Sequence, residues 1–187
     1  TGIKDIEDLS AAPNSYSSLI QWKFDDNAKD TSGNNNHGVL HPAEAGSITF
    51  VQDGNDGCVQ FKDPKDRIKS PTINFGETFT VSGWIKISPN FTGNWNRFIV
   101  TEDVNSGFGL FQDSNSMSWK FTVNGSWGLP LGGTFQPGEW QYLTGTYDGE
   151  LARLYVNGNL VSGPASLQPP ANPQQQVVLG RDKNTWE

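Results

Sequence analysis

Oxygen-bearing side chains crowd into one stretch of the chain, between Asp25 and His37, and could bind a metal ion there. Within these thirteen positions lie Asp25, Asp26, Asn27, Asp30, Asn34, Asn35 and Asn36. Carboxylate and amide oxygens suit a hard cation such as Ca²⁺, which takes about 6 to 8 oxygen ligands in flexible geometry. The alternative is that these residues only cap turns, as Asn and Asp commonly do. Zinc is not expected, because His37 and His41 have no third ligand with them.

Tryptophan is the second residue type that could do chemistry, since a flat indole ring stacks on the apolar face of a sugar. Three of the 7 tryptophans lie in polar turn sequences, where the ring is exposed unless something covers it: Trp95, Trp127 and Trp186. Trp119, between Ser118 and Lys120, is a further candidate for the ligand-binding surface. Arg97, close to Trp95, could read a sugar carboxylate or hydroxyl. The alternative is that the loop tryptophans fold back onto the end of the domain.

Groups suited to catalysis are scarce. The sequence has no Gly-x-Ser-x-Gly nucleophile motif, and its two histidines lie in one loop, so no nucleophile and base pair stands out. Acidic pairs such as Asp148 with Glu150, Asp63 with Asp66, and Glu102 with Asp103 are better explained as solvated loop charges than as a glycosidase pair. The chain is therefore expected not to be a stand-alone enzyme. A degenerate or unrecognised polysaccharide-active enzyme is the alternative.

Length and composition predict one acidic, turn-rich domain. The 187 residues include 21 Gly and 11 Pro, too many for a helical bundle, while 11 Phe and 7 Trp argue against disorder. A formal net charge of -7 disfavours nucleic acid as a partner. No stretch approaches the roughly 20 apolar residues that span a bilayer. Cys58 is the single cysteine, so no internal disulfide is possible, and a small buried hydrophobe is its simplest role.

The pattern of short apolar segments predicts an all-β sandwich. From residue 19 onward such segments recur between turn signals, for example at 19–24, 48–51, 58–61, 79–87, 97–101, 117–123, 140–147 and 151–156. In residues 79–87 the odd positions are apolar or Gly and the even ones polar, except for Trp84. The Asn157–Gly158 pair predicts a tight hairpin turn. Residues 1–18 show no such alternation and are interpreted as a linker or docking arm.

Several motifs in order resemble laminin-G-like, concanavalin A-like jelly-roll modules. The series begins with Trp-Lys-Phe-Asp at 22–25 and Asp-Thr-Ser-Gly-Asn at 30–34. It continues with Phe-Thr-Val-Ser-Gly-Trp at 79–84, Thr-Tyr-Asp-Gly at 146–149, Leu-Tyr-Val-Asn-Gly at 154–158 and Leu-Gly-Arg at 179–181. Each motif alone is weak, but the ordered series is specific for the fold. The resemblance implies a two-sheet antiparallel β-sandwich, a concanavalin A-like jelly roll, over residues 19–187.

The resemblance also implies a function. It predicts a secreted, non-catalytic, calcium-stabilised module that binds a polysaccharide or oligosaccharide and serves a glycoside hydrolase or polysaccharide lyase as an accessory domain. The implied calcium ligands are Asp25, Asp30, Asn34 and Asn36. Trp22, Trp84 and Trp140 fall in strand motifs and are expected to pack in the core or between the sheets. The Glu-x-Asp-x-x-Glu motif of concanavalin-like glucanases is absent, which agrees with a non-catalytic role.

One departure from the family pattern concerns the end of the sandwich. Members usually continue past Leu-Gly-Arg with a strand of the type Phe-x-Gly-x-Ile-Asp-x-Val, whose Asp can face the metal, whereas this sequence stops at Glu187. The resemblance therefore predicts that the domain lacks its final strand: either the chain is truncated or processed, or a partner domain or chain supplies the strand. The alternative function is a protein-interaction or adhesion module whose exposed aromatic residues dock another domain, or a structural partner domain of a larger enzyme.

Overall fold

A computed structural model describes residues 18–89, 97–113, 117–127 and 131–180, and within them the chain forms strands and turns without a helix. No described segment is a helix that is long and apolar enough to cross a membrane. The strands are β1 (Val39–His41), β2 (Ile48–Asp53), β3 (Asp56–Phe61), β4 (Arg67–Asn74), β5 (Phe79–Ile85), β6 (Arg97–Thr101), β7 (Phe108–Asp113), β8 (Ser118–Val123), β9 (Leu131–Thr134), β10 (Gln141–Tyr147), β11 (Leu151–Val156), β12 (Asn159–Ser166) and β13 (Gln174–Gly180).

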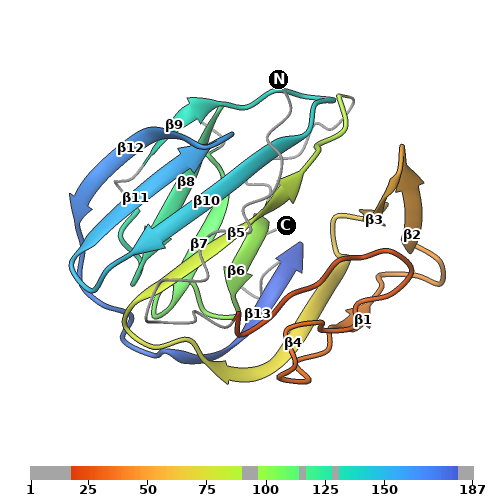
Figure 1. Ribbon diagram of the computed structural model, residues 1–187, viewed down its shortest axis with the longest axis horizontal. Coiled ribbons are helices and arrows are strands. Elements are labelled where there is room, and N and C mark those ends of the chain that lie inside the picture. The colour runs from red at the N-terminus through yellow and green to blue at the C-terminus, as the bar shows by residue number, and fades with distance from the viewer. Residues whose placement is uncertain (1–17, 90–96, 114–116, 128–130, 181–187) are drawn as a thin grey trace, which may run out of the picture.

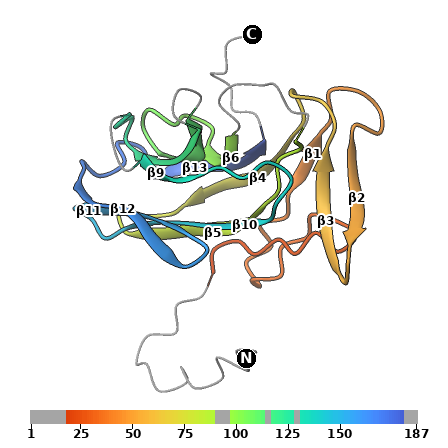
Figure 2. The same ribbon diagram turned by 90° about the horizontal axis from the view of Figure 1, so that it is seen from above.

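Two large antiparallel sheets form the sandwich (Figure 1). The seven-stranded sheet has the order β1-β4-β13-β6-β7-β8-β9, and the four-stranded sheet has the order β12-β11-β10-β5. Strands β2 and β3 form a separate pair. Figure 2 shows the two large sheets edge-on as two layers, with β2 and β3 standing beside them. The predicted all-β sandwich is thus confirmed.

The main core lies between the two large sheets. Alternate residues of each strand point inward, as the pleat requires, so β10 buries Leu143 and Tyr147 while Thr144 and Thr146 face outward. Phe121 of β8 packs from the opposite sheet against Gly145, where an added Cβ would lie 2.5 Å from the Phe121 ring. The glycine therefore lets the two sheets approach closely at this point.

The Asn157–Gly158 turn forms as the sequence predicts. Asn157 has φ 50° and Gly158 φ 78°, which are the left-handed conformations that a type I′ turn needs. The turn joins β11 to β12, and Val156 and Asn159 pair directly on either side of it. The hairpin prediction is therefore confirmed.

The apolar run at residues 19–24 does not become a strand. This segment makes one isolated bridge, between Trp22 and Asp30, and belongs to none of the sheets. Its side chains still pack on the core, because Ile20, Trp22 and Phe24 are half-buried against the main cluster. The interpretation of residues 1–18 as a linker or docking arm concerns residues that, apart from Ser18, lie outside the described ranges.

Candidate functional site

A row of three side chains crosses the outer face of the seven-stranded sheet. Arg97 of β6 pairs with Phe111 of β7, and Phe111 pairs with Lys120 of β8. Directly opposed residues in a sheet project from the same face. The neighbours Leu110 and Phe121 belong to the core between the sheets, so Phe111 and Lys120 point away from that core. The row thus places two cations on either side of a phenyl ring.

Trp127 lies over this row and completes an aromatic and cationic cluster, which we call the Trp127 cluster: Arg97, Phe111, Lys120 and Trp127. The Trp127 and Phe111 ring centroids are 5.8 Å apart. The Arg97 guanidinium lies 4.6 Å from the Phe111 centroid and 5.9 Å from that of Trp127, and the Lys120 Nζ lies 6.0 Å from Trp127. These contacts are within cation–π range. They fix the orientation of an indole that remains 40% exposed.

Charge in the Trp127 cluster is partly balanced by Asp113. Lys120 is 6% exposed, and this burial lowers the pKa of its ammonium, while the negative charge of Asp113 acts in the opposite direction. A small apolar group of Val100, Val104, Phe111 and Val178 supports the row from the same side of the sheet. The result is a firmly supported surface with one exposed ring, the half-buried Arg97 beside it and the buried Lys120 behind them in the cluster.

The structure brings two of the predicted ligand-binding residues, Arg97 and Trp127, together. It does not test whether they bind a ligand. Phe111 and Lys120 were missed by sequence reasoning, because only the strand register reveals that they face the same surface. Trp95 and Trp186, the other loop tryptophans, lie outside the described residues.

Trp119 was wrongly included among the surface residues. Its side chain is 1% exposed, its Nε1 donates a hydrogen bond to Gln141 Oε1 at 3.2 Å, and its ring packs edge-on against Phe135. Strand alternation explains the error: with Ser118 and Lys120 directed outward, the residue between them must point into the core. Trp119 is therefore a core residue.

A second aromatic surface lies on the four-stranded sheet, where core packing was expected. Trp84 of β5 is 60% exposed and contacts Tyr142 of β10, with ring centroids 5.2 Å apart. Trp140 is 37% exposed and donates from Nε1 to Asp53 Oδ2 at 2.7 Å. The expectation that Trp84 and Trp140 are core residues is therefore wrong, while Trp22 does pack against the core.

The oxygen-rich loop is organised around the carboxylate of Asp30. Its two oxygens accept four hydrogen bonds of 2.8–2.9 Å, from the backbone N–H groups of Gln21, Ser32 and Asn36 and from the Ser32 hydroxyl. Burial alone would raise the pKa of Asp30, but these hydrogen bonds outweigh it and hold the pKa at about 2. Asp30 therefore serves as an acceptor that ties residue 21 to the loop.

The other predicted calcium ligands also take part in local bonding. The side-chain amide groups of Asn34 and Asn36 donate to the carbonyls of Ser18 and Leu19 at 2.8 and 2.9 Å, and the Asp25 carbonyl accepts from Gln52 Nε2 at 3.3 Å. Among the described residues, no group of three or more His, Cys, Asp and Glu side chains is placed to hold a metal ion. The hydrogen bonds of these residues fit the turn-capping alternative, and the calcium site stays a prediction.

Acidic residues considered for catalysis have partners in the fold. Glu102 pairs with Lys69 at 2.7 Å, and Asp148 pairs with Arg153 at 2.8 Å. Asp66 is 1% exposed and accepts hydrogen bonds from the backbone N–H groups of Ala43, Lys62 and Asp63. These carboxylates stabilise turns and strand contacts.

The chain belongs to the concanavalin A-like lectin/glucanases superfamily. A laminin-G family model of that description matches residues 53–187, which is most of the chain. The family resemblance read from the sequence is therefore confirmed. No curated protein matches the chain.

Solved structures share the fold at low sequence identity. Domain 4 of a GH43 extracellular arabinanase from Geobacillus stearothermophilus, in complex with arabinotriose, aligns with a TM-score of 0.69 and 17% identity over 90% of this chain and 84% of that domain. The receptor-binding domain of a botulinum neurotoxin C/D mosaic aligns with a TM-score of 0.58 and 20% identity, covering 91% of this chain and 45% of the other. Trypanosoma rangeli sialidase aligns with a TM-score of 0.55 and 14% identity, and the alignment covers 79% of this chain and 24% of the sialidase.

Proposed function

We propose that the protein is a non-catalytic module that binds an oligosaccharide or polysaccharide through the Trp127 cluster. The observation that carries this proposal is the orientation of Trp127, which Phe111, Arg97 and Lys120 hold in place while leaving 40% of the side chain exposed. A preorganised aromatic ring loses little conformational freedom when a sugar stacks on it. The neighbouring Arg97 guanidinium can donate hydrogen bonds to sugar hydroxyls or pair with a uronate, while the buried Lys120 acts through its contact with the Trp127 ring.

The similar structures support the ligand class. The arabinanase domain of the same fold was solved with arabinotriose bound. We therefore choose arabino-oligosaccharides as the first probes. The proposed setting is extracellular, as accessory domain of a polysaccharide-active protein, which agrees with the extracellular origin of that arabinanase.

Replacement of the exposed indole tests the proposal. Trp127→Ala is expected to weaken binding of arabinotriose, or of the best ligand from a glycan array, by about tenfold, because one stacked ring contributes roughly 1 to 2 kcal/mol by area burial. Isothermal titration calorimetry measures the affinity, and the melting midpoint should stay close to that of the parent. Trp95→Ala gives the same test for the predicted loop partner.

Trp84→Ala is the matched control, since Trp84 is exposed on the other sheet. Unchanged binding in the Trp84 variant and weakened binding in the Trp127 variant support the proposed site. Full binding by both Trp95→Ala and Trp127→Ala contradicts it, and loss confined to Trp84→Ala would move the site to the four-stranded sheet. Release of reducing or unsaturated ends from any polysaccharide would contradict the non-catalytic part.

The calcium site stays a prediction with its own test. Thermal unfolding is compared with and without EDTA, because an ion present at about 100 times its dissociation constant stabilises the folded state by about 2.7 kcal/mol. A lower midpoint in EDTA supports a bound ion near Asp25 and Asp30. An unchanged melting midpoint contradicts the calcium site and supports turn capping as the role of these residues.

A second candidate function is docking to another polypeptide. It is favoured by one observation: among the described strands, β5 ends the order of the four-stranded sheet and pairs with β10 alone.

A further inference from the structure

Aromatic side chains are grouped on the outer face of the four-stranded sheet. Trp84 of β5 and Tyr142 of β10 pair directly across the two strands, and their ring centroids are 5.2 Å apart. Their neighbours face the core: Leu143 is buried there, and a Cβ added to Gly83 would lie 2.9 Å from the Phe98 ring. Because successive side chains of a strand alternate between its two faces, Trp84 and Tyr142 point away from the core.

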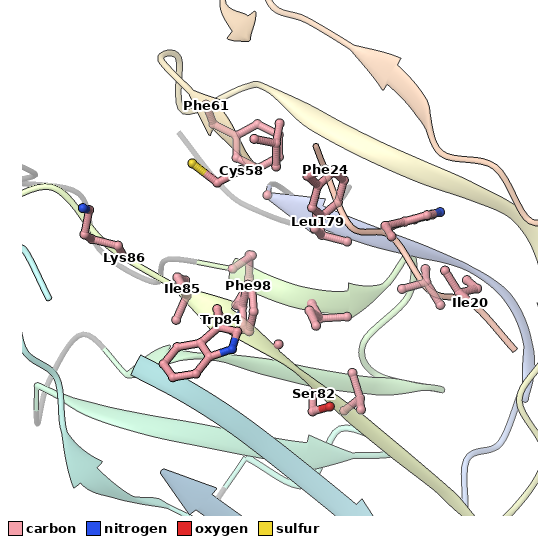
Figure 3. Close-up of a pocket in the computed structure, with 18 of the residues that line it drawn as sticks. Ile20, Phe24, Cys58, Phe61, Ser82, Trp84, Ile85, Lys86, Phe98 and Leu179 are labelled. Carbon is pink, nitrogen blue, oxygen red and sulfur yellow. The ribbon is translucent and has the colours of Figure 1, made fainter. Parts of the chain in front are cut away.

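The same face continues onto β11 with a third ring and two hydroxyl groups. Thr144 of β10 pairs with Ser82 of β5 on one side and with Tyr155 of β11 on the other. Directly opposed residues project from the same face, so these three side chains lie beside the first two rings. The Tyr142 hydroxyl donates a hydrogen bond to Ser82 Oγ at 2.8 Å. Figure 3 shows Ser82 and Trp84 along β5, with the indole directed toward β10.

Trp140 adds a fourth ring at the other end of this face. Lys86 follows Trp84 by two residues, so it leaves β5 on the same side, and its Nζ lies 5.2 Å from the centroid of the Trp140 ring. The Trp140 Nε1 donates to Asp53 Oδ2 at 2.7 Å, and Asp53 also pairs with Lys86. These contacts fix an indole that remains 37% exposed. We call the whole surface the Trp84 platform: Ser82, Trp84, Trp140, Tyr142, Thr144 and Tyr155.

The chemistry of the Trp84 platform fits an uncharged, hydroxyl-rich ligand. None of its residues is charged, and two ion pairs border it, Lys86 with Asp53 at one end and Arg153 with Asp148 at the other. Each of these pairs balances its own charge, so neither favours an ionic ligand. Rings and hydroxyl groups supply instead the stacking and the hydrogen bonds that a neutral sugar needs. A protein partner is favoured less, because serine is depleted at protein–protein interfaces.

The spread of the rings favours a polymer over a short sugar. Trp140 and Thr144, the partner of Tyr155, are four residues apart, so the rings extend over roughly 14 Å along β10. Sites for small molecules are concave and enclose most of the ligand surface. The outer face of a sheet does not enclose a single sugar, but successive units of a long chain can each stack on a ring. Many weak contacts then add up.

We propose that the Trp84 platform binds long, uncharged polysaccharide chains at the surface of an insoluble polysaccharide. The rings stack on the apolar faces of successive sugar units, and the Ser82 and Thr144 hydroxyls hydrogen-bond to sugar hydroxyls. Trp84 is 60% exposed and therefore has the most surface to offer. This site lies on the opposite sheet from the Trp127 cluster, and the inference goes beyond the proposed function without depending on it.

Adsorption to solid polysaccharides tests the proposal. The full chain is mixed with microcrystalline cellulose, chitin, insoluble xylan or insoluble linear arabinan, and the protein left in solution is measured. We expect adsorption to at least one of them, and adsorption to none would overturn the proposal. On that solid, Trp84→Ala should weaken adsorption by about tenfold, because one stacked ring is lost. Trp84→Phe keeps a ring and should weaken it less.

Val39→Ala is the matched control, since Val39 is an apolar side chain 56% exposed on β1 of the other sheet. This variant should adsorb like the parent. The melting midpoints of the Val39 and Trp84 variants should stay close to that of the parent, because both side chains are exposed. Equal adsorption of Trp84→Ala and the parent overturns the proposal.

Two variants separate the Trp84 platform from the proposed oligosaccharide site. Trp127→Ala should keep its adsorption to the solid that Trp84→Ala no longer holds, whereas Trp84→Ala should bind arabinotriose as the parent does. Adsorption lost in Trp127→Ala but kept in Trp84→Ala would overturn the platform and leave the Trp127 proposal standing. Adsorption lost only in Trp84→Ala supports the platform, whether or not the parent binds arabinotriose.

Sedimentation velocity separates a polysaccharide from a second copy of the chain as the occupant. The parent and Trp84→Ala are expected to sediment alike. A dimer of the parent that Trp84→Ala dissociates would assign the platform to self-association and overturn the proposal.

Discussion

Two buried carboxylates, Asp30 and Asp66, each hold several segments of the chain together. Asp30 accepts four hydrogen bonds from Gln21, Ser32 and Asn36, and Asp66 accepts from Ala43, Ser47, Lys62 and Asp63. For both groups burial opposes ionisation, yet the hydrogen bonds keep the pKa below its ordinary value. Folding therefore favours the ionised carboxylates of Asp30 and Asp66. By the same coupling, ionisation of these groups stabilises the folded state.

This coupling predicts a specific loss of stability in acid. Because the folded-state pKa of Asp30 is about 2 and its ordinary value is 3.8, the stabilisation is present above about pH 4 and is lost as the pH falls toward 2. Asp30→Asn should lower the free energy of unfolding at pH 7 by about 1 to 3 kcal/mol, since donors lose a charged acceptor. The difference from the parent should shrink between pH 4 and pH 2.

Urea unfolding at a series of pH values measures this effect. Asp26→Asn is the control, because Asp26 is exposed in the same loop. A deficit of the Asp30 variant that is constant over the whole pH range would show that the carboxylate charge is not what stabilises the loop.

At the scale of the strand, the close approach of β8 and β10 makes one glycine essential for packing. Gly145→Ala would place a Cβ 2.5 Å from the Phe121 ring, so one sheet must shift. We expect a loss of about 1 to 3 kcal/mol in the free energy of unfolding. Thr144→Ala, on the outward face of the same strand, should change stability far less, and equal losses in the two variants would contradict the packing argument.

Strand patterns predicted most of the sandwich, because alternation and turn residues are local signals. The Asn157–Gly158 hairpin and the two faces of β5 followed from the residues themselves. The strand predicted at residues 19–24 does not form, because a strand also needs a hydrogen-bonded neighbouring strand. This segment has only one bridge, between Trp22 and Asp30. Its apolar residues pack on the core without forming a ladder.

Only two of the four residues of the Trp127 cluster were predicted, because the cluster also depends on how neighbouring strands pair. Trp127 was named because a tryptophan in a polar turn suggests sugar binding, and Arg97 because it follows Trp95 closely in the sequence. Phe111 and Lys120 join them through the register of β6, β7 and β8, which no sequence pattern specifies. Trp119 was misplaced because its aromatic character was weighed without the alternation of its neighbours, and Trp84 because a strand motif was taken to mean burial.

At the scale of the whole molecule, the charge distribution predicts how salt affects the binding of a neutral glycan as opposed to a charged one. The chain carries a formal charge of -7, whereas the Trp127 cluster contains two cations. A neutral oligosaccharide should therefore bind with an affinity that changes less than about twofold between about 0.05 M and about 0.5 M salt, because screening acts only on charges. Calorimetric titration of arabinotriose at both salt concentrations checks this, and a strong salt dependence would contradict stacking as the main contribution.

The position of β13 in the seven-stranded sheet has a consequence for how the chain folds. This strand, the last one described, lies between β4 and β6, with Gln174 opposite Asn74 and Val177 opposite Thr101. Contacts between residues so distant in sequence form only after a large loss of chain entropy, which places such sheets among slow folders, on the order of milliseconds to seconds. During synthesis β4 can pair with β1 and β6 with β7, but the other edge of each strand must wait unpaired until β13 has left the ribosome. The join between β1-β4 and β6-β7-β8-β9 is thus the last part of the larger sheet to assemble, and nascent chains are expected to depend on chaperones until then.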